Sequence, residues 1–459
     1  MNKQDLIELN QKQEKFFHSG KTLDVRFRLE SLRTIKSLIN KYENKLFEAL
    51  REDLGKSPFE SYASETGMTI QEINLILRNL KRWARPRKAY TPLVHFIAKS
   101  YYQYEPFGRV LIISPWNYPF QLLMVPLIGA VSAGNCILAK PSRHAVHTTT
   151  VLQEMMNEAF NPEYIHILRG SKEVNESLLY EKYDYIFFTG STHVATHVMK
   201  SASHTLTPIS LELGGKNPTI VTKDANIKLA AKRILWGKLL NGGQSCVATD
   251  YVLVHAEMKS ELIEEMKKYL HKSYGNDPEQ SEDFCRIINK ENTERIKNYI
   301  DPDKIITGGK VDVEKRYVAP TIIDEPELDK PIMHEEIFGP VLPVIGYTDL
   351  DEAIQMIVDR PKPLALYIFS TSKNNQQKII RKTQSGTLCI NETVVHFINP
   401  YLPFGGIGKS GMGRYHGKFS FETFSYKRPV LKKSNLIDIP VRYPPYSKNK
   451  LRVIRYFVR

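Results

Sequence analysis

Three side chains in this sequence have the chemistry needed to act on a carbonyl carbon. Cys246 ends the string GGQSC, in which two glycines and small side chains would let a substrate approach the thiol. Glu212 lies in ELGGK, where an apolar run meets a glycine turn, and Asn117 lies in a proline-flanked turn. A thiol can attack a carbonyl, an amide can donate to the oxyanion that forms, and a carboxylate can activate water. Each also has an ordinary alternative: an inert buried cysteine, a solvated acid and a turn asparagine.

Lys140 is a fourth candidate, because it ends the apolar run 136–140 directly before Pro141. A lysine at a strand end that faces a crevice would bind an anion or a hydroxyl group. Alternatively, its stem covers apolar surface while its ammonium group reaches solvent. The residues alone leave both interpretations open.

The first part of the chain predicts a helical layer followed by a Rossmann-like, doubly wound parallel sheet. Residues 1–85 read as helical, with Thr69 and Glu72 as a capping box. From residue 110, short apolar runs each precede a helical segment, at 110–114, 136–140, 165–170 and 185–191. Such a sheet binds ligands beyond the carboxyl ends of its strands, where the sequence places Trp116, Asn117, Lys140, Gly170, Gly190 and Ser191. No GxGxxG string follows a strand, so spacing does not by itself establish dinucleotide binding.

A second alternating series begins near Ile209 and predicts a second α/β domain that would hold Glu212 and Cys246. Its apolar runs are 209–213, 218–222, 251–255, 340–347, 364–371 and 386–391. Extended aromatic segments around 101–107 and after Gly417 predict a small β arm that bridges or dimerises. We therefore expect a helical layer at 1–85, a bridging segment at 86–105, a dinucleotide domain at 106–209, a catalytic domain at 210–414, and a bridging segment with a basic aromatic tail at 415–459.

Composition indicates a globular protein of two or three domains. Hydrophobic residues make up 42% and charged residues 25% of the 459 residues. The four cysteines are far apart and form no CxxC or cysteine–histidine spacing, which predicts neither a disulfide framework nor a metal site and favours the cytoplasm. The N-terminus lacks the apolar core of a signal peptide. Residues 120–139 are long enough for a membrane span, but polar residues and a proline predict a buried helix that runs into a strand.

The net charge of +14 suggests an anionic partner, although a lysine-rich solvated surface explains it equally well. Most cations are scattered along the chain without the interleaved aromatic residues of a single-strand binder, so nucleic acid is not expected. The tail 448–459 is different, because basic residues alternate there with apolar ones. It could contact the inner face of an anionic membrane, or it could be a docked or fraying terminus.

Considered together, these motifs resemble the aldehyde dehydrogenase superfamily. The resemblance runs in order from about residue 105 to 431, through EPFGRVLIISPWNYPF, LAKPS, FTGST, LELGGKNP, GGQSC, EEIFGPVLPV and PFGGIGKSGMGRYHG. Within the superfamily, GQSCVATDYVL, SGMGRYHGKFSFETFSYKRPVL and RYPPY resemble the class 3 branch, which includes enzymes of fatty and other lipophilic aldehydes.

The resemblance implies roles for individual residues. Cys246 would attack the aldehyde, Asn117 and the Cys246 N–H would bind the oxygen, and Glu212 would activate water to hydrolyse the thioester. The cofactor, NAD or NADP, would contact Trp116, Lys140, Gly190, Ser191, Glu336 and Phe338, with Lys140 and Glu336 on ribose hydroxyls. Arg143 stands where many members carry an acid, which predicts that NADP is used at least as well as NAD.

For the substrate and the oligomeric state, the sequence leaves more alternatives open than it does for the reaction. Class 3 resemblance and the tail favour a long fatty or isoprenoid (carotenoid) aldehyde, and small aliphatic or aromatic aldehydes remain open. A homodimer follows from the resemblance. Two other functions are also open: a catalytically retired binding or structural protein on the same scaffold, and a thiol hydrolase or acyltransferase. The hydrolase would need a histidine base, and none of the thirteen histidines lies in a triad-like motif.

Overall fold

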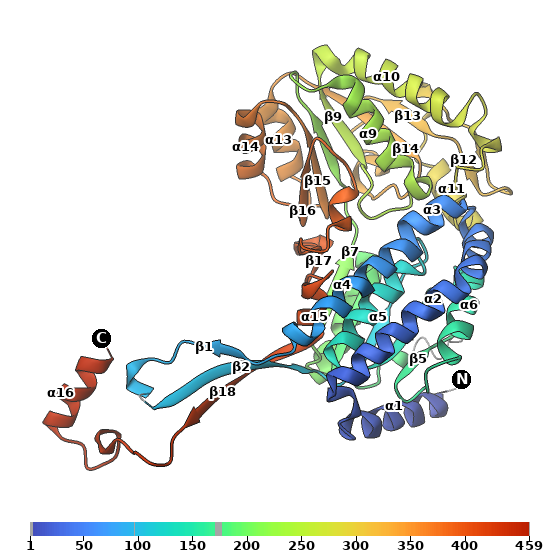
Figure 1. The fold of residues 1–459 in the computed structure, drawn as a ribbon. Helices are drawn as coiled ribbons and strands as arrows, with labels where there is room; N and C mark the ends of the chain where they lie inside the picture. Colours follow the sequence, from blue (N-terminus) through green and yellow to red (C-terminus); the bar gives the residue numbers. More distant parts are fainter. Residues whose placement is uncertain (1–2, 96, 170–176, 459) are drawn as a thin grey trace.

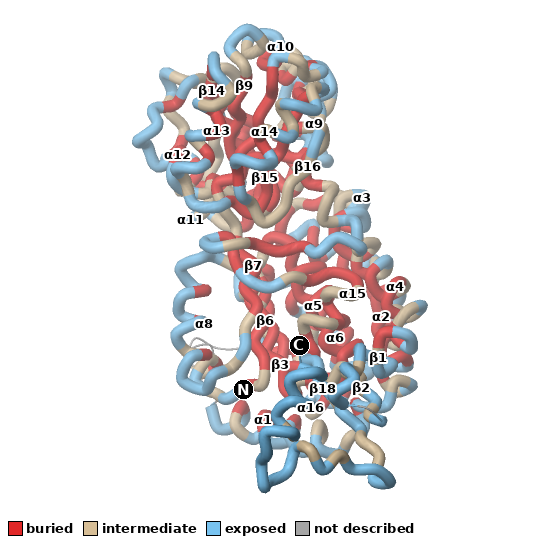
Figure 2. The backbone as a smooth tube through the Cα atoms, turned by 90° about the vertical axis from the view of Figure 1, so that its left-hand side faces the viewer, coloured by how far each residue is buried: buried red, intermediate tan, exposed pale blue. Residues whose placement is uncertain are grey.

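The computed structural model describes residues 3–95, 97–169 and 177–458, so Gly170 lies outside the described residues. Helical and sheet layers form a body with a lower part and an upper part, and an extended arm leaves the lower part (Figure 1). In Figure 2 the strands of both parts are buried, whereas the arm is largely exposed. This architecture confirms the α/β class with parallel sheets and a separate small β arm.

The N-terminal residues form the predicted helical layer. Its helices are α1 (Lys3–His18), α2 (Val25–Leu54), α3 (Pro58–Ser61) and α4 (Gly67–Trp83). The predicted capping box is wrong, because Thr69 and Glu72 lie inside one continuous helical path from α3 into α4. The Thr69 hydroxyl donates to the Glu65 carbonyl, and the Glu72 carboxylate accepts from the Gly417 N–H. A pattern of polar residues cannot distinguish a cap from partners supplied by distant residues.

The first sheet has the strand order β17-β7-β6-β3-β4-β5. All neighbours are parallel except β17, which pairs antiparallel with β7. Its elements, with the helices that connect them, are β3 (Arg109–Ile113), α5 (Gln121–Ala133), β4 (Cys136–Lys140), α6 (Val146–Asn157), β5 (Ile165–Ile167), β6 (Tyr185–Gly190), α8 (Thr192–Thr205), β7 (Ile209–Leu213) and β17 (Gly411–Met412).

Successive residues along a strand are buried on opposite faces of this sheet. Val110 and Ile112 pack into the cluster of α2, α5 and α6, while Leu111 packs on the other face with residues of α1 and α8. The apolar stretch 120–139 forms α5 and β4, as predicted, and every residue of α5 is buried. Within residues 3–95, 97–169 and 177–458, no helix is long and apolar enough to cross a membrane.

The strand 209–213 was assigned by the sequence to the second domain, and this assignment is wrong. β7 pairs with β6 in the first sheet, with Thr189 opposite Glu212. A strand that follows a crossover helix generally returns to the same sheet beside its predecessor, and an alternating pattern does not reveal the point at which a new sheet begins. The other domain limits drawn from the sequence stay predictions.

The second sheet has the order β10-β13-β14-β9-β8-β15-β16 and is parallel except for β10. Its strands are β8 (Pro218–Val221), β9 (Tyr251–His255), β10 (Ile305–Thr307), β13 (Thr321–Asp324), β14 (Val341–Tyr347), β15 (Ala365–Phe369) and β16 (Thr387–Ile390). A short pair, β11 (Val311–Asp312) and β12 (Tyr317–Val318), lies apart. The helices in the same part of the chain as the second sheet are α9 (Ile227–Leu239), α10 (Ala256–Tyr274), α11 (Lys290–Lys297), α12 (Pro331–His334), α13 (Leu350–Val358) and α14 (Lys373–Lys382).

The arm combines segments that are far apart in the sequence. β2 (Ala98–Pro106) pairs with β1 (Arg87–Ala89) on one side and along its whole length with β18 (Ser425–Lys433) on the other. α15 (Lys418–Thr423) leads into β18, and α16 (Lys448–Phe457) ends the described chain. The prediction that the aromatic segments pair away from either core is confirmed, and the arm projects from the body in Figure 1.

Candidate active site

Eight of the predicted site residues line one cavity between the two sheets. They come from the turn after β3, from the carboxyl ends of β6 and β7 and the residue after β6, and from loops of the second part: Trp116, Asn117, Gly190, Ser191, Glu212, Cys246, Glu336 and Phe338. Lys140 and Arg143 line a separate cavity beyond the end of β4. All of these belong to strand ends or loops, where a doubly wound sheet places its ligands.

A tight turn presents Cys246. After α9 the backbone adopts positive φ angles at Asn241, Gly242 and Gly243 before it reaches the thiol. A Cβ atom at Gly243 would lie 2.3 Å from the Gly339 carbonyl oxygen, so glycine is required there. Burial raises the pKa of the Cys246 thiol, the carboxylates of Glu336 and Glu212 raise it further, and the backbone N–H groups of Cys246 and Val247 oppose this shift.

Asn117 lies directly against this turn. Its side-chain Nδ2 donates to the Gln244 carbonyl at 3.0 Å, and its own carbonyl accepts from Asn241 Nδ2 at 2.7 Å. These bonds tie the turn after β3 to the turn that carries the thiol. The amide of Asn117 is therefore fixed two residues away from Cys246, and one N–H of the amide is left for an oxyanion.

The side chain of Glu212 is buried without a hydrogen bond that would offset the cost of removing it from water. Neither of its carboxyl oxygens has a hydrogen-bond partner in the described part of the chain. Burial raises its pKa well above the usual range, and only the more distant charge of Arg414 opposes the shift. An ionised carboxylate held in this way lowers the stability of the fold, and its raised pKa suits a general base.

A buried ion pair that sequence reasoning missed holds the Asn117 turn. Lys56 Nζ contacts Glu65 Oε1 at 2.6 Å, and both side chains are fully buried. Lys56 also donates to the Asn117 carbonyl at 3.3 Å, while Glu65 Oε2 accepts from the N–H groups of Phe120 and Gln121. The pair thus fixes both ends of the turn. No local sequence signal marks it, because its partners are about 55 to 61 residues away.

Glu336 and Phe338 lie on a loop that buried charges anchor. The Asp250 carboxylate accepts from the Ile337 N–H at 3.1 Å and pairs with Lys216 at 2.6 Å. Burial, followed by the charge of Asp250, raises the pKa of Glu336 to about 8. Glu336 Oε1 has no partner among the described residues, and a Cβ at Gly214 would lie 2.1 Å from its other oxygen.

The cavity beyond β4 is cationic. Lys140 lines it together with Arg143 and Arg169, and Arg169 was not predicted. Burial, followed by the charge of Arg143, lowers the pKa of Lys140 to about 8. Lys140 Nζ donates to the Pro141 carbonyl at 2.8 Å, so its ammonium group is held near the strand end and does not extend freely into solvent.

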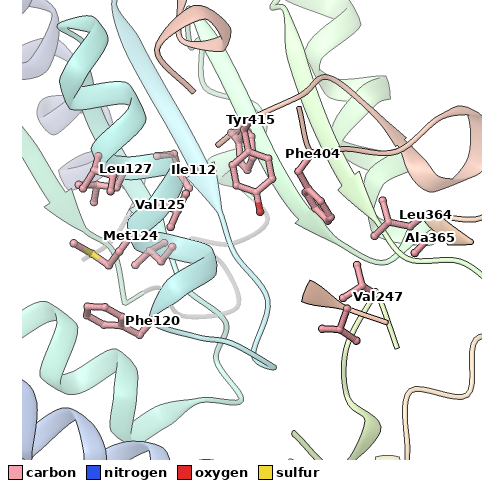
Figure 3. Close-up of a cluster of buried hydrophobic side chains, with 14 of the residues drawn as sticks. Ile112, Phe120, Met124, Val125, Leu127, Val247, Leu364, Ala365, Phe404 and Tyr415 are labelled. Atoms are coloured by element: carbon pink, nitrogen blue, oxygen red, sulfur yellow. The ribbon is translucent and has the colours of Figure 1, made fainter. Parts of the chain in front are cut away.

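A second cavity meets the first at the thiol. Glu212 and Cys246 line both cavities. The walls of the second cavity are mainly aromatic and aliphatic: Tyr118, Leu122, Val247, Leu364, Phe397, Phe404 and Tyr415. Figure 3 shows Val247, Leu364 and Phe404 close to one another, with Tyr415 beyond. His416 also lines it and stays neutral, because burial lowers its pKa to about 3.

The chain is similar to known aldehyde dehydrogenases in sequence and in fold. A model described as the aldehyde dehydrogenase family matches residues 1–430. The chain is 45% identical over 446 residues to a 4,4'-diaponeurosporen-aldehyde dehydrogenase of Staphylococcus aureus, covering 97% of each chain. It is 42% identical to a dimeric, NADP-preferring aldehyde dehydrogenase of Rattus norvegicus, covering 94% of this chain and 95% of the relative. The substrate-bound structure of Staphylococcus aureus AldH superposes with a TM-score of 0.97 at 44% identity, covering 99% of each chain.

Proposed function

We propose a mechanism and a substrate class for this chain, which belongs to the aldehyde dehydrogenase family and oxidises aldehydes with NAD or NADP. The observation that carries the proposal is that a mainly apolar cavity and a more polar one meet at Cys246 and Glu212. An aldehyde that enters from one side and a cofactor that enters from the other would meet at the thiol.

In the first step, the sulfur of Cys246 bonds to the aldehyde carbon and the carbonyl oxygen becomes an oxyanion. The Asn117 amide and the Cys246 N–H donate to this oxygen. The thiol proton is released to solvent as the bond forms, so Glu212 stays free to act on water in the last step.

The residues of the polar cavity fit a nicotinamide dinucleotide. Glu336 offers a carboxylate oxygen without a partner, and Ser191 caps the N-terminus of the 14-residue helix α8, which suits a pyrophosphate. Lys140 lies in the neighbouring cavity. We assign Glu336 and Lys140 to ribose hydroxyls, and Trp116, Gly190, Ser191 and Phe338 to further contacts with the cofactor. When bound, the nicotinamide supplies the oxidation that converts the thiohemiacetal to a thioester.

In the last step, Glu212 removes a proton from water as the water attacks the thioester carbon. The carbon–sulfur bond breaks, the carboxylic acid leaves, and Cys246 regains its proton. The product is therefore a free acid. Its formation consumes one water molecule for each aldehyde oxidised.

The substrate is a long lipophilic aldehyde. The mainly apolar lining of the second cavity supports this, as does the name of the relative that acts on diaponeurosporen-aldehyde. The test is kcat/KM for saturated aldehydes of increasing length. Each buried CH2 is expected to raise kcat/KM about fourfold, equivalent to about 0.8 kcal/mol. A flat series would favour the alternative, a small aliphatic or aromatic aldehyde.

The cationic cavity beyond β4 favours NADP. The guanidinium groups of Arg143 and Arg169 beside Lys140 would suit a 2′-phosphate. The relative described as NADP-preferring supports the same choice. We therefore infer that NADP is used at least as well as NAD.

The alternative functions have simple tests. A retired scaffold would give no change in absorbance at 340 nm with any aldehyde and either cofactor, whereas the intact set of Cys246, Glu212 and Asn117 supports turnover. A thiol hydrolase would need a histidine base, and burial lowers the pKa of the lining histidine His416 to about 3, which makes it a weak proton acceptor. Aldehyde oxidation that depends strictly on added cofactor would exclude the hydrolase as the main activity.

We also infer a cytoplasmic homodimer that touches the inner face of the membrane through its tail. β18 lies at the outer edge of the arm sheet, with no further strand beyond it among the described residues, so its backbone can pair with a second copy. The relative named as dimeric supports this assembly. Mass measurement in solution tests it, and a monomer at micromolar concentration would contradict it.

A further inference from the structure

Side chains that the proposed mechanism does not use hold the backbone around Cys246. Asn217 follows the glycine turn after β7, and its Nδ2 donates to the Cys246 carbonyl at 2.7 Å and to the Ala248 carbonyl at 3.1 Å. Its Oδ1 accepts from the Ala365 N–H at 2.9 Å, directly after Leu364 in the wall of the mainly apolar cavity. Asn217 is only 1% exposed, so water does not compete for these bonds. It therefore ties the nucleophile to that wall.

The carbonyl between those two is held from the second sheet. Tyr367 lies on β15, its side chain is fully buried, and its hydroxyl donates to the Val247 carbonyl. The Ser245 carbonyl accepts from the Ala248 N–H at 3.1 Å, which closes the turn. Each carbonyl from residue 245 to residue 248 therefore has a partner, and these partners fix the orientation of the peptide planes.

Bonds that fix the carbonyls also fix the N–H groups around the thiol. In a trans peptide, the C=O and the following N–H lie in one plane and point in opposite directions. Asn217 on the Cys246 carbonyl therefore turns the Val247 N–H to the opposite side, and the bond at the Ser245 carbonyl does the same for the Cys246 N–H. Burial raises the pKa of the Cys246 thiol, and these two N–H groups, which face the sulfur, oppose the shift. The thiolate therefore has two backbone donors.

We propose that Asn217 and Tyr367 are positioning residues that aim the N–H groups of Cys246 and Val247 at the sulfur and thereby stabilise the thiolate that attacks the aldehyde. The thiolate, and not the thiol, is the nucleophile, so its population limits the attack. Without these two anchors the peptide planes can rotate and the donors leave the sulfur. The consequence for turnover rests on the proposed function, whereas the reactivity of the thiol can be measured without it.

The charged and titratable groups near the sulfur stay in place when Asn217 is replaced. Among the described residues, the groups that interact with the thiol or share a cavity with it are Glu212, Arg295, Glu336, Tyr118, Tyr367, Tyr415 and His416. Asn217→Leu alters none of them. A change in the reactivity of the thiol in this variant therefore reports on the backbone donors and not on a neighbouring charge.

The matched control for Asn217→Leu is Asn135→Leu. Asn135 precedes β4 and is also fully buried. Its Nδ2 donates to the carbonyls of Ala130 and Phe424, and its Oδ1 accepts from the Gly108 N–H. It makes the same kinds of hydrogen bond as Asn217 but lines neither cavity at the thiol. Both variants should lower the free energy of unfolding, because each leaves buried backbone groups without a partner.

Tyr367→Phe is a milder variant, because it removes one hydroxyl and keeps the packed ring. Its control is Tyr347→Phe, since the Tyr347 hydroxyl is buried on β14 and donates to the Val221 carbonyl at 3.2 Å. Tyr347 also lines neither of the two cavities. This second pair decides the question if Asn217→Leu does not fold.

The test is the rate at which iodoacetamide alkylates Cys246 in the full-length protein, measured by mass spectrometry of the Cys246 peptide with the partly buried Cys389 as internal reference. Loss of a hydrogen bond to an ionised group raises a pKa by about one unit. The thiolate fraction then falls about tenfold, while the remaining thiolate becomes more nucleophilic. Asn217→Leu should therefore react about threefold more slowly at pH 7.5, and Tyr367→Phe about twofold. Raising the pH should restore both rates.

The two control variants should alkylate Cys246 as fast as the unmodified protein does. A purely structural role predicts the opposite change, because a loosened fold exposes the thiol and speeds the reaction at every pH. In either pair, a Cys246 rate that equals or exceeds that of the control variant would overturn the proposal.

Turnover separates this proposal from the proposed function. In Asn217→Leu, kcat/KM for a short aldehyde should fall together with the alkylation rate, while KM for NADP stays unchanged because the polar cavity keeps its lining. Slower alkylation with unchanged kcat/KM would overturn the role of the two anchors in the reaction. Absence of oxidation in the unmodified protein would defeat the proposed function alone, because the alkylation rates do not depend on it.

Discussion

Replacing Lys56 with methionine should slow the reaction even though Lys56 lines neither cavity at the thiol. Its ammonium group lies between Glu65 and the Asn117 carbonyl, and both ion-pair side chains are fully buried. In the variant the Asn117 turn keeps the contact of Glu65 with Phe120 and Gln121 but loses the contact at its other end. We expect Asn117 to move from the position that the oxyanion requires.

The expected magnitudes follow from the burial of the pair. Removing one partner of a fully buried ion pair leaves an uncompensated charge, which costs about 3–5 kcal/mol of the free energy of unfolding. A displacement of the oxyanion donor by about 1 Å lowers kcat about a hundredfold. Burial raises the pKa of Glu65, and Lys56 opposes this shift ahead of the backbone N–H groups of Gln121 and Phe120. Without Lys56 the pKa of Glu65 in the folded state should rise further above its unfolded value, so the loss of stability should be smaller at pH 5.5 than at pH 8.

Two controls separate positioning from stability. Lys45→Met breaks an ion pair of the same kind on α2, Lys45 with Glu154 at 2.7 Å, but both side chains are about half exposed. It should change the free energy of unfolding by less than about 1 kcal/mol and leave kcat unchanged. Lys56→Met/Glu65→Leu removes both charges, so stability should largely return while kcat stays low.

The assay is urea unfolding of each variant together with steady-state oxidation of a short aldehyde, followed at 340 nm. The KM of the aldehyde should change much less than kcat, since the turn acts on the oxyanion. A normal kcat in the double variant would refute the positioning role. A destabilised Lys56→Met variant with normal kcat would lead to the same conclusion.

Three further predictions concern single residues. Asn117→Ala should lower kcat about 10²- to 10³-fold with the fold intact by circular dichroism, and a loss below tenfold would contradict its role as an oxyanion donor. Arg143→Glu should lower kcat/KM for NADP at least about tenfold and spare NAD, whereas equal effects on both cofactors would remove Arg143 from phosphate recognition. The KM for the cofactor should fall as pH rises through the Glu336 pKa of about 8, because the ionised carboxylate accepts more strongly, and Glu336→Gln should abolish this dependence.

The sequence predicted the elements better than their assembly. Apolar runs with period two and interrupted helical patterns identified the strands of both sheets, because burial on two faces leaves a local signature. The assignment of residues 209–213 failed, since the pattern fixes a strand but not its neighbour. The capping box at Thr69 failed for a related reason, because Glu72 is satisfied by Gly417.

The candidate site shows the same difference between what the sequence predicts and what only the fold shows. The predicted residues could be named because they lie in motifs at strand ends, and the fold brings eight of them to one cavity. The supporting residues could not be named. Lys56 and Glu65 act on a turn about 55 to 61 residues away, and Asp250 anchors the loop at Ile337 from 87 residues away. Such partners are fixed by tertiary packing, which leaves no mark on the local sequence.

The most direct test of the central claim is mass spectrometry of Glu212→Gln mixed with aldehyde and NADP and quenched within seconds. If Cys246 is the nucleophile and Glu212 activates the water, the variant should accumulate one acyl group, located on the peptide that contains Cys246. Cys246→Ala should carry none. An acyl group on Cys136, Cys285 or Cys389, or turnover by Cys246→Ala at the rate of the unmodified protein, would contradict the mechanism.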